Sequence, residues 1–460
     1  MTQPPEVSVE SQQHLASVSL SEAFFYWLKL GCISFGGPTG QIALMHTDLV
    51  ERKRWISERR FLHALNYCML LPGPEAMQLA VYIGWLMHRT LGGIMAGTLF
   101  VLPSLFMFIG LSWLYVEYGD LPVVAGILFG IKPAVVAIVL SAAWRIGSRS
   151  LKNRWLIGIA LLAFISIAFL QLPFPLIIGI AAVIGLIGGR VMPDFFQLGG
   201  GHTSSDKTFG PAIIDDHTPP PAHAALSRRK LLLTTMIGIT IGVTALALLY
   251  VVLGEKNPLS QMAWFFTKAA LLTFGGAYAV LPYVYQGAVS TFQWLTPEQM
   301  MDGLALGETT PGPLIMIVAF VGFIGGWSKE IFATISLFGP IALFASGAAG
   351  ALVATFFTFL PSFIFILAGG PIVEATRDNI RLTAPLTAIS AAVVGVITSL
   401  AVFFAEHVFH ILQPLAEWDW ISIAIAFVAG IALMRFKLST VRVIVACAVV
   451  GLVVSYVPWW

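Results

Sequence analysis

The sequence predicts an all-α, polytopic membrane protein with two homologous halves of inverted topology that contain discontinuous or re-entrant helices. Three observations lead to this fold class. The composition is strongly apolar, a set of sequence landmarks occurs twice, and Lys and Arg are distributed differently around the two copies.

The apolar composition indicates that lipid is the main environment of the chain. Of 460 residues, 58% are hydrophobic and 10% are charged, with a mean hydropathy of +0.87, whereas soluble domains carry about 25% charged residues. A helix needs about 20 apolar residues to cross the hydrocarbon, and helices are expected because lipid offers no partner to an exposed peptide group. Apolar stretches recur at Leu91–Tyr115, Val123–Trp144, Trp155–Leu170, Leu176–Gly189, Leu231–Val252, Gly347–Gly369, Leu382–Phe404, Ile421–Met434 and Val441–Val457.

The repeated landmarks indicate an internal duplication. Lys29, Phe35-Gly36-Gly37, Trp55 and Pro72-Gly73-Pro74 recur in the same order, each 239 residues later, as Lys268, Phe274-Gly275-Gly276, Trp294 and Pro311-Gly312-Pro313. Leu102-Pro103-Ser104 recurs as Leu360-Pro361-Ser362 with a larger offset of 258 residues, which predicts an insertion around Ser328–Ser346. Ungapped spacing of this kind is the signature of a structural repeat.

A hydrophilic stretch from Met192 to Lys230, rich in Gly, Pro, His, Ser and Asp, separates the copies and is expected to be a disordered connection. The predicted organisation is a polar N-terminal tail at residues 1–20, a first transport repeat at 21–191, a cytoplasmic linker at 192–230, a connecting transmembrane helix at 231–254 and a second, inverted repeat at 255–460. The tail lacks an apolar core, so it does not resemble a cleaved signal peptide.

The basic residues predict that corresponding loops lie on opposite sides of the membrane. Cytoplasmic loops are enriched in Lys and Arg. The loop after the first Phe-Gly-Gly carries Arg52, Lys53, Arg54, Arg59 and Arg60, while its counterpart 285–299 has no Lys or Arg. Conversely, 117–121 has none, while its counterpart carries Arg377 and Arg381. Inverted repeats are common in secondary transporters, whose substrate sites lie near the membrane midplane.

Each copy contains two breaks in its apolar segments, one at Phe-Gly-Gly and one at Pro-Gly-Pro. Proline removes a backbone donor, and glycine tolerates conformations that other residues avoid. We therefore expect Phe61–Leu86 and Met300–Gly326 to form re-entrant hairpins with Pro-Gly-Pro at the tip. Helix N-termini exposed by such breaks attract anions. The alternative is that both motifs only allow close packing, since Gly and Pro are frequent in transmembrane helices.

Lys29 and Lys268 precede the Phe-Gly-Gly motifs at equivalent positions within apolar runs. A buried ammonium group is costly unless it is paired, so two lysines brought together by pseudo-symmetry would form a site for a divalent anion, with the neighbouring amides as further donors. The alternative is that each lysine extends its charged end to the membrane interface.

Several polar residues adjoin the Pro-Gly-Pro motifs. Three roles are compatible with the positions of Glu75 and Glu308: to carry a coupling proton, to pair with a lysine or to cap a helix. Asn66, Gln78, Thr309 and Thr310 either donate hydrogen bonds to an oxyanion or join helices.

Other chemistry is poorly supported. The sequence has neither GxxxxGK[ST] for ATP nor HExxH for a metalloprotease. Cys32, Cys68 and Cys447 are isolated, and His407 with His410 lacks nearby Cys ligands, so neither a disulfide nor a metal site is expected. A net charge of +2 does not suggest a nucleic-acid partner. We expect no enzyme activity and no cofactor.

The paired motifs, with LLPGPEAMQLAVYIGW in one half and GLALGETTPGPLIMIVAFVGF in the other, resemble the long, two-domain chromate ion transporters. The resemblance implies chromate efflux across the inner membrane and chromate resistance, with sulfate as a structural analogue and the electrochemical gradient as the energy source. By motif, the implied site residues are Phe35, Gly36, Gly37, Pro72, Gly73 and Pro74, with Phe274, Gly275, Gly276, Pro311, Gly312 and Pro313. The first half reads FGGPTGQ and the second FGGAYAV, so the two sites differ chemically.

The resulting hypothesis is an alternating-access secondary transporter that exports chromate. A transporter of sulfate or another small anion and an anion channel are the alternatives. The expected partners are chromate, with sulfate as a competing analogue, and the lipid bilayer; a homodimer stays open.

Overall fold

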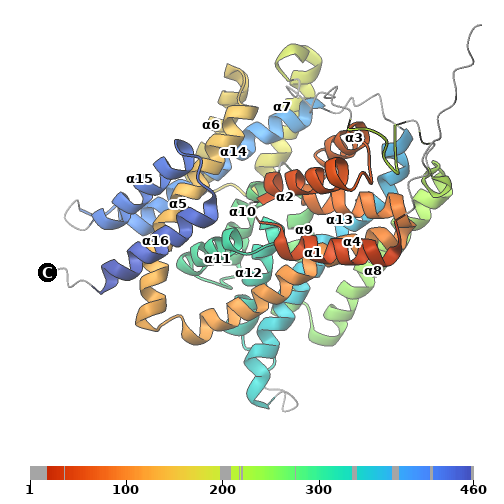
Figure 1. Ribbon diagram of the computed structural model, residues 1–460. Helices are drawn as coiled ribbons and strands as arrows, with labels where there is room; N and C mark the ends of the chain where they lie inside the picture. Colours follow the sequence, from red (N-terminus) through yellow and green to blue (C-terminus); the bar gives the residue numbers. More distant parts are fainter. Residues whose placement is uncertain are drawn as a thin grey trace, which may run out of the picture.

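The computed structural model describes residues 18–35, 37–196, 209–216, 218, 221–274, 276–333, 339–375, 383–414 and 418–456. Within these residues the chain is helical, and its only β-type pairing is a bridge between Ile56 and Ile214. Figure 1 shows the helices. The all-α prediction is confirmed.

The first half contains eight elements before the linker. They are α1 (Leu20–Ile33), α2 (Gly37–Met45), the π-helix η1 (His46–Arg52), α3 (Glu58–Cys68), α4 (Glu75–Tyr118), α5 (Pro122–Ser150), α6 (Arg154–Ala168) and α7 (Phe174–Val191). The short helices η2 (Pro193–Phe195) and η3 (Ala222–Ala224) belong to the linker.

The second half repeats this order after the connecting helix α8 (Arg228–Leu253). Its elements are α9 (Pro258–Leu271), α10 (Ala277–Tyr285), the π-helix η4 (Gln286–Thr291), α11 (Pro297–Thr309), η5 (Leu314–Met316), α12 (Ile317–Ser328), η6 (Gly339–Ile341), α13 (Ala342–Ala375), α14 (Thr383–Phe409), α15 (Trp420–Met434) and α16 (Thr440–Ser455). Even the π-helices recur, each after a short helix that follows Phe-Gly-Gly.

Six of the described helices are long and apolar enough to cross a membrane, namely α4, α5, α7, α8, α13 and α14. Four shorter apolar helices accompany them. Each apolar stretch predicted from the sequence falls on a helix, and among its described residues only 169–170 and 456 lie past a helix end. The protein is a multi-pass membrane protein.

Helix α4 is a hairpin rather than one straight rod. His88 and Arg89 leave helical geometry, with φ of +55° at Arg89, and reverse the chain direction. Gly84 and Gly92 bring the two arms together: a methyl group at Gly84 would lie 2.5 Å from the Gly92 carbonyl oxygen. In the second half, α12 and α13 form the same hairpin, and the predicted insertion falls where they join, partly outside the described residues.

The corresponding helices α4 and α13 cross in opposite directions. Gly93 lies against Leu367, and Gly97 lies against Phe363, so chain numbers rise on one helix as they fall on the other. Both helices are of spanning length. The two copies therefore have opposite orientations, as the distribution of basic residues predicts; Arg377 and Arg381, part of that pattern, lie outside the described residues.

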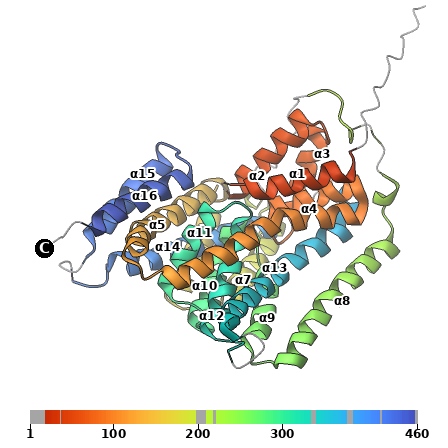
Figure 2. The same ribbon diagram turned by 60° about the horizontal axis from the view of Figure 1, so that its bottom comes forward.

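The two halves exchange their last two helices. Helices α6 and α7 pack on α14, while the corresponding α15 and α16 pack on α5. Figure 1 shows α15 and α16 beside α5 at one end of the molecule. Because each half covers a helix of the other, neither is expected to bury its apolar surface alone. The connecting helix α8 instead lies at the periphery against α9 and α13, as Figure 2 shows, and buries none of its residues.

Part of the linker is folded, so the expectation of a disordered connection is wrong for it. Residues 209–216, 218 and 221–224, here called the docked linker, pack on the first half beside its basic loop. The Ser57 hydroxyl donates to the Asp216 carboxylate at 2.6 Å, and Ser57 N donates to Ile214 O at 3.0 Å. Arg54 and Arg60 donate to linker carbonyls. The positive charge of the loop 52–60 predicts its side of the membrane. The same loop also provides the surface on which the docked linker packs.

Candidate functional site

The broken segments of the two halves meet at their tips. Gly73 N, in the first Pro-Gly-Pro, donates to Thr273 O, just before the second Phe-Gly-Gly, at 2.7 Å. Reciprocally, Gly312 N donates to Ser34 O at 2.8 Å. Because both bonds join equivalent positions of opposite copies, the contact has the pseudo-two-fold form of an inverted repeat. We call residues 34–37, 72–74, 273–276 and 311–313 the tips.

Glycine is required at the centre of each Pro-Gly-Pro tip. Gly73 and Gly312 have φ of +126° and +106°, a region that side chains disfavour. A methyl group at Gly73 would lie 2.3 Å from the Ser362 hydroxyl oxygen, and one at Gly312 would lie 2.5 Å from Ser104 Cβ. Ser104 and Ser362 are themselves equivalent, and both are fully buried. Each tip is therefore enclosed by the long helix of the other copy.

The Pro-Gly-Pro segments form hairpin tips, as predicted. Helix α3 enters and the first arm of α4 leaves, with Pro74 as the N-cap and Glu75 in the first turn. Neither α3 nor that arm reaches the length needed to span the hydrocarbon. Backbone amides at the start of this arm thus lie within the protein, where their partial positive charge favours a negative group.

The Phe-Gly-Gly segments are tips of a similar kind. They separate α1 from α2 and α9 from α10, with φ of +70° at Gly37 and +96° at Gly276. Phe35 is 46% exposed and Phe274 is half-buried. Gly36 and Gly275 lie outside the described residues.

Two buried glutamines hold the tips. The amide of Gln41, which is 1% exposed on α2, donates to Gly312 O and, at 3.4 Å, to Ser34 O. The amide of Gln78 donates to Pro72 O at 2.8 Å and to the Ser362 hydroxyl at 3.3 Å. Both Oε1 atoms and the Ser104 hydroxyl are buried without a hydrogen-bond partner in the described part of the chain. The tips therefore retain unused polar groups for water or a solute.

A charged cluster adjoins the tips from the second half. The Tyr278 hydroxyl on α10 donates to the Glu308 carboxylate on α11. Both side chains are buried, and Arg145 of α5 interacts electrostatically with both. Arg145 is also exposed, so this residue contacts solvent as well as the buried pair. Glu75 is half-buried on α4.

The structure does not place the two predicted lysines at the tips. Lys29 is exposed on α1, two residues before Gly31, which packs against Leu99 and Pro103 of α4. Lys268 is half-buried on α9 and lies 5.5 Å from the centre of the Trp264 ring. No ion pair involving either lysine is found within the described residues. This placement favours the interfacial alternative over a paired-lysine site.

The remaining predicted polar residues have local roles. The Thr309 hydroxyl donates to Ala305 O and Leu306 O at 3.1 Å, and that of Thr310 to Gly307 O at 3.5 Å. Their donors are therefore engaged within α11. Asn66 is half-buried on α3.

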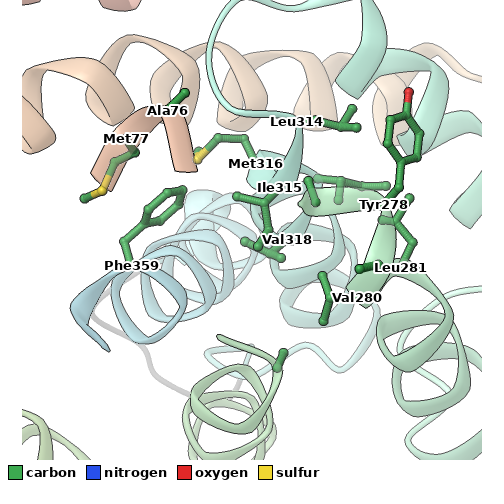
Figure 3. Packing of buried hydrophobic residues seen from close by; sticks show 14 of the residues in the cluster. Ala76, Met77, Tyr278, Val280, Leu281, Leu314, Ile315, Met316, Val318 and Phe359 are labelled. Atoms are coloured by element: carbon green, nitrogen blue, oxygen red, sulfur yellow. The ribbon is translucent and has the colours of Figure 1, made fainter. Parts of the chain in front are cut away.

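An apolar cluster between the copies supports the tips. Figure 3 shows Ala76 and Met77 of α4 near Met316 and Phe359, with Leu281 of α10 across from them. The Tyr278 hydroxyl points away from this cluster in the same view. Close packing fixes the tips because a dense interior does not deform continuously.

The comparisons with known proteins agree with this architecture. The family model for chromate transporters matches residues 21–186 and again 260–452. The chain belongs to the chromate transporter family. Both matches of the family model fall on one structural copy each, so the duplication seen in the helices is also a duplication of the family's domain.

Two relatives named chromate transport protein match nearly the whole chain, and a third matches part of it. The chain is 28% identical over 453 residues to the chromate transport protein of Cupriavidus metallidurans, covering 98% of this chain and 97% of the relative. It is 32% identical over 440 residues to the chromate transport protein of Pseudomonas aeruginosa, covering 94% and 92%. An uncharacterized transporter of Bacillus subtilis, YwrA, matches over 99% of its own length but 39% of this chain at 30% identity. No solved structure matches.

Sequence reasoning missed several tip residues. Ser34, Gln41, Ser104, Thr273, Tyr278, Arg145 and Ser362 all contact or adjoin the tips, yet none belongs to a motif that was weighed for binding. The matched recurrence of Ser104 and Ser362 was the one available signal. Arg145 carries no local signal of this kind because its distance to the tips depends on the fold.

Proposed function

We propose that this protein exports chromate across the cytoplasmic membrane by alternating access and thereby confers chromate resistance. The observation that carries the proposal is the reciprocal contact of Gly73 with Thr273 and of Gly312 with Ser34 in a chain of the chromate transporter family. Relatives bear the name chromate transport protein. A midplane site between inverted repeats suits a solute that is exposed to each side in turn.

The proposed anion site lies at the tips. Amides at the first turns of α2, α4 and α10, those of η5 and the Ser104 hydroxyl are donors suited to an oxyanion. Phe35 and Phe274 border these donors, and Gly36 and Gly275 join the same set by motif. The site is chemically unequal, since Gln41 in one copy corresponds to Val280 in the other.

Arg145 supplies positive charge in this proposal, in place of Lys29 and Lys268. It is exposed, yet it interacts with the buried Tyr278 and Glu308 beside the tips. A guanidinium at such a position attracts an oxyanion and can bind two of its oxygens at once. We propose Glu308, already hydrogen-bonded to Tyr278, and Glu75 as the carboxylates that exchange a proton near the anion.

The test uses the purified full-length chain in liposomes loaded with chromate. We expect counterflow, meaning that unlabelled chromate on one side accelerates uptake of labelled chromate from the other, and we expect sulfate to compete. A channel would give flux down the gradient without counterflow. Transport of sulfate with no chromate flux would reject chromate as the substrate, and absence of both fluxes would reject the function. Cells carrying the chain should also survive more chromate than cells carrying a Gly312→Val variant.

A further inference from the structure

A second polar cluster lies away from the tips, where α11 meets α4 and α5. Asp302 of α11 is 2% exposed. Its Oδ2 accepts a hydrogen bond from the Tyr115 hydroxyl at 2.9 Å and lies 4.0 Å from Lys132 Nζ. Its Oδ1 is buried and has no hydrogen-bond partner in the described part of the chain. The carboxylate is thus only partly compensated, which is costly for a buried charge.

A cavity of about 560 Å³ adjoins this cluster. Its lining includes Tyr115, Lys132, Asp302 and two exposed carboxylates, Asp120 and Glu298. The cavity lies at the end of α4 opposite the docked linker, the side that the distribution of basic residues predicts to be outside. Water and protons from outside therefore have a route to a buried carboxylate.

The matching positions of the first copy carry different groups. Asp302 corresponds to His63, and Tyr115 to Val373, and these two are also joined: His63 Nε2 lies 2.9 Å from Val373 O. Helix α3 is thus linked to α13 in the same way as α11 is linked to α4. At these two positions the pairing of Asp302 with Tyr115 consists of a carboxylate and a phenol, whereas His63 contacts only a backbone carbonyl.

We propose that Asp302 is a proton-binding site open to the outside, with Lys132 as its counter-charge, and that proton entry there drives anion export. This inference rests on the proposed transport function and adds a coupling site distinct from Glu75 and Glu308. The proton binds to Asp302 Oδ1, converting the carboxylate to the neutral acid. Lys132 is thereby released from its partner and is left as a free positive charge facing the cavity.

Burial, which favours the neutral acid, and the groups that face Asp302 together set the pH at which this happens. Tyr115 donates from α4, Lys132 approaches from α5, Asp120 comes from the turn between them and Glu298 from α11 itself. His407 of α14 acts on Glu298. Helix α12 presents Trp327 and Ser328, which do not titrate, and α16 places the backbone of Cys447 against Gly130 of α5. Tyr115 and Lys132 both favour the charged carboxylate, while the acidic groups favour the neutral form.

The decisive variant is Asp302→Asn in proteoliposomes. With wild type, acidifying the outside should accelerate chromate export by roughly fivefold or more, the usual size of coupling between two sites. Asp302→Asn should lose this acceleration but keep chromate counterflow at equal pH. Asp120→Asn and Glu298→Gln, which alter exposed carboxylates of the same cavity, should keep both. Unchanged acceleration in Asp302→Asn would overturn the proposal, as would equal loss in all three variants.

Two further measurements separate a proton site from a structural contact. Tyr115→Phe and Lys132→Met each remove a group that stabilises the carboxylate, so the midpoint of the pH response should shift to less acid values. A shift to more acid values, or none, would contradict the assignment. Independently of any transport, infrared difference spectra between acid and neutral pH should show a protonated-carboxyl band that Asp302→Asn lacks. If that band is present in wild type while chromate counterflow is absent, the proton site stands and the proposed substrate fails.

Discussion

The amide of Gly73 donates to the carbonyl of Thr273, and this single bond joins the Pro-Gly-Pro of one copy to the Phe-Gly-Gly of the other. Its symmetric counterpart runs from Gly312 to Ser34. Since each tip is held by the opposite copy, a movement of one repeat against the other necessarily alters both contacts. This is the property that an alternating-access mechanism needs at its substrate site.

Substitution of the two tip glycines should impair transport for separable reasons. Gly73→Ala adds backbone strain of about 1–2 kcal/mol at positive φ and clashes with the Ser362 hydroxyl and, less closely, with the Gln78 amide. We expect strong loss of chromate flux, partly restored by Ser362→Ala, which removes the clashing oxygen. Gly312→Ala should not be restored by Ser104→Ala, because there the clash is with Cβ. Gly110→Ala, which meets nothing within 4 Å, is the matched control. Equal behaviour of both rescue pairs would contradict this geometry.

Gln41 should be essential for the shape of the tips. Gln41→Leu leaves the buried carbonyl of Gly312 without its side-chain donor, a loss of about 1–3 kcal/mol for an unsatisfied buried group. We expect chromate flux to fall by about tenfold or more while the protein still purifies as a monodisperse species. Gln41→Glu keeps the size but loses the amide donor, and should be as defective. Activity of Gln41→Glu near that of wild type would show that volume, and not the hydrogen bond, matters.

The cation that serves the anion site should be Arg145. Arg145→Met should raise the chromate concentration needed for half-maximal transport, because the charge beside Tyr278 and Glu308 is lost. Lys29→Met, which removes an exposed charge of equal sign, should leave transport within about twofold of wild type, as surface charges contribute little. The opposite ranking of these variants in a transport assay would restore the paired-lysine hypothesis.

The docked linker should loosen in acid. His223 Nε2 lies 2.9 Å from Trp85 O. Burial lowers the pKa of His223; the contact with Trp85 O opposes this shift, and the charges of Arg89 and Lys230 add to it. A histidine with a lowered pKa favours the neutral form, so docking is fully stable above the ordinary histidine pKa of about 6.5 and weakens as the pH falls below it.

Hydrogen exchange of the docked linker at about pH 5.5 and about pH 7.5, corrected for the intrinsic rate, measures this loosening. Protection should fall in acid for wild type. His223→Gln, which can still donate to Trp85 O, should show nearly pH-independent protection. If His223→Gln loses protection in acid as the wild type does, the group that titrates is not His223.

The sequence by itself determined the spanning helices, the duplication, the inverted orientation and the breaks, because each leaves a local pattern. Apolar length, Gly and Pro at matched spacing and basic loops are properties of short segments. The hairpins around residues 72–74 and 311–313 followed from those patterns without tertiary information.

Only the tertiary structure decided which side chains meet. Lys29 and Lys268 share a motif position, but the face of a short helix that points inward depends on what packs against it, and α1 turns Gly31 rather than Lys29 toward α4. Gln41, Arg145 and Asp302 looked ordinary in the sequence because their partners lie far along the chain. The docked linker was missed for a related reason: its polar composition disfavours a core of its own, whereas hydrogen bonds from Arg54, Ser57 and Arg60 of a preformed surface hold it in place.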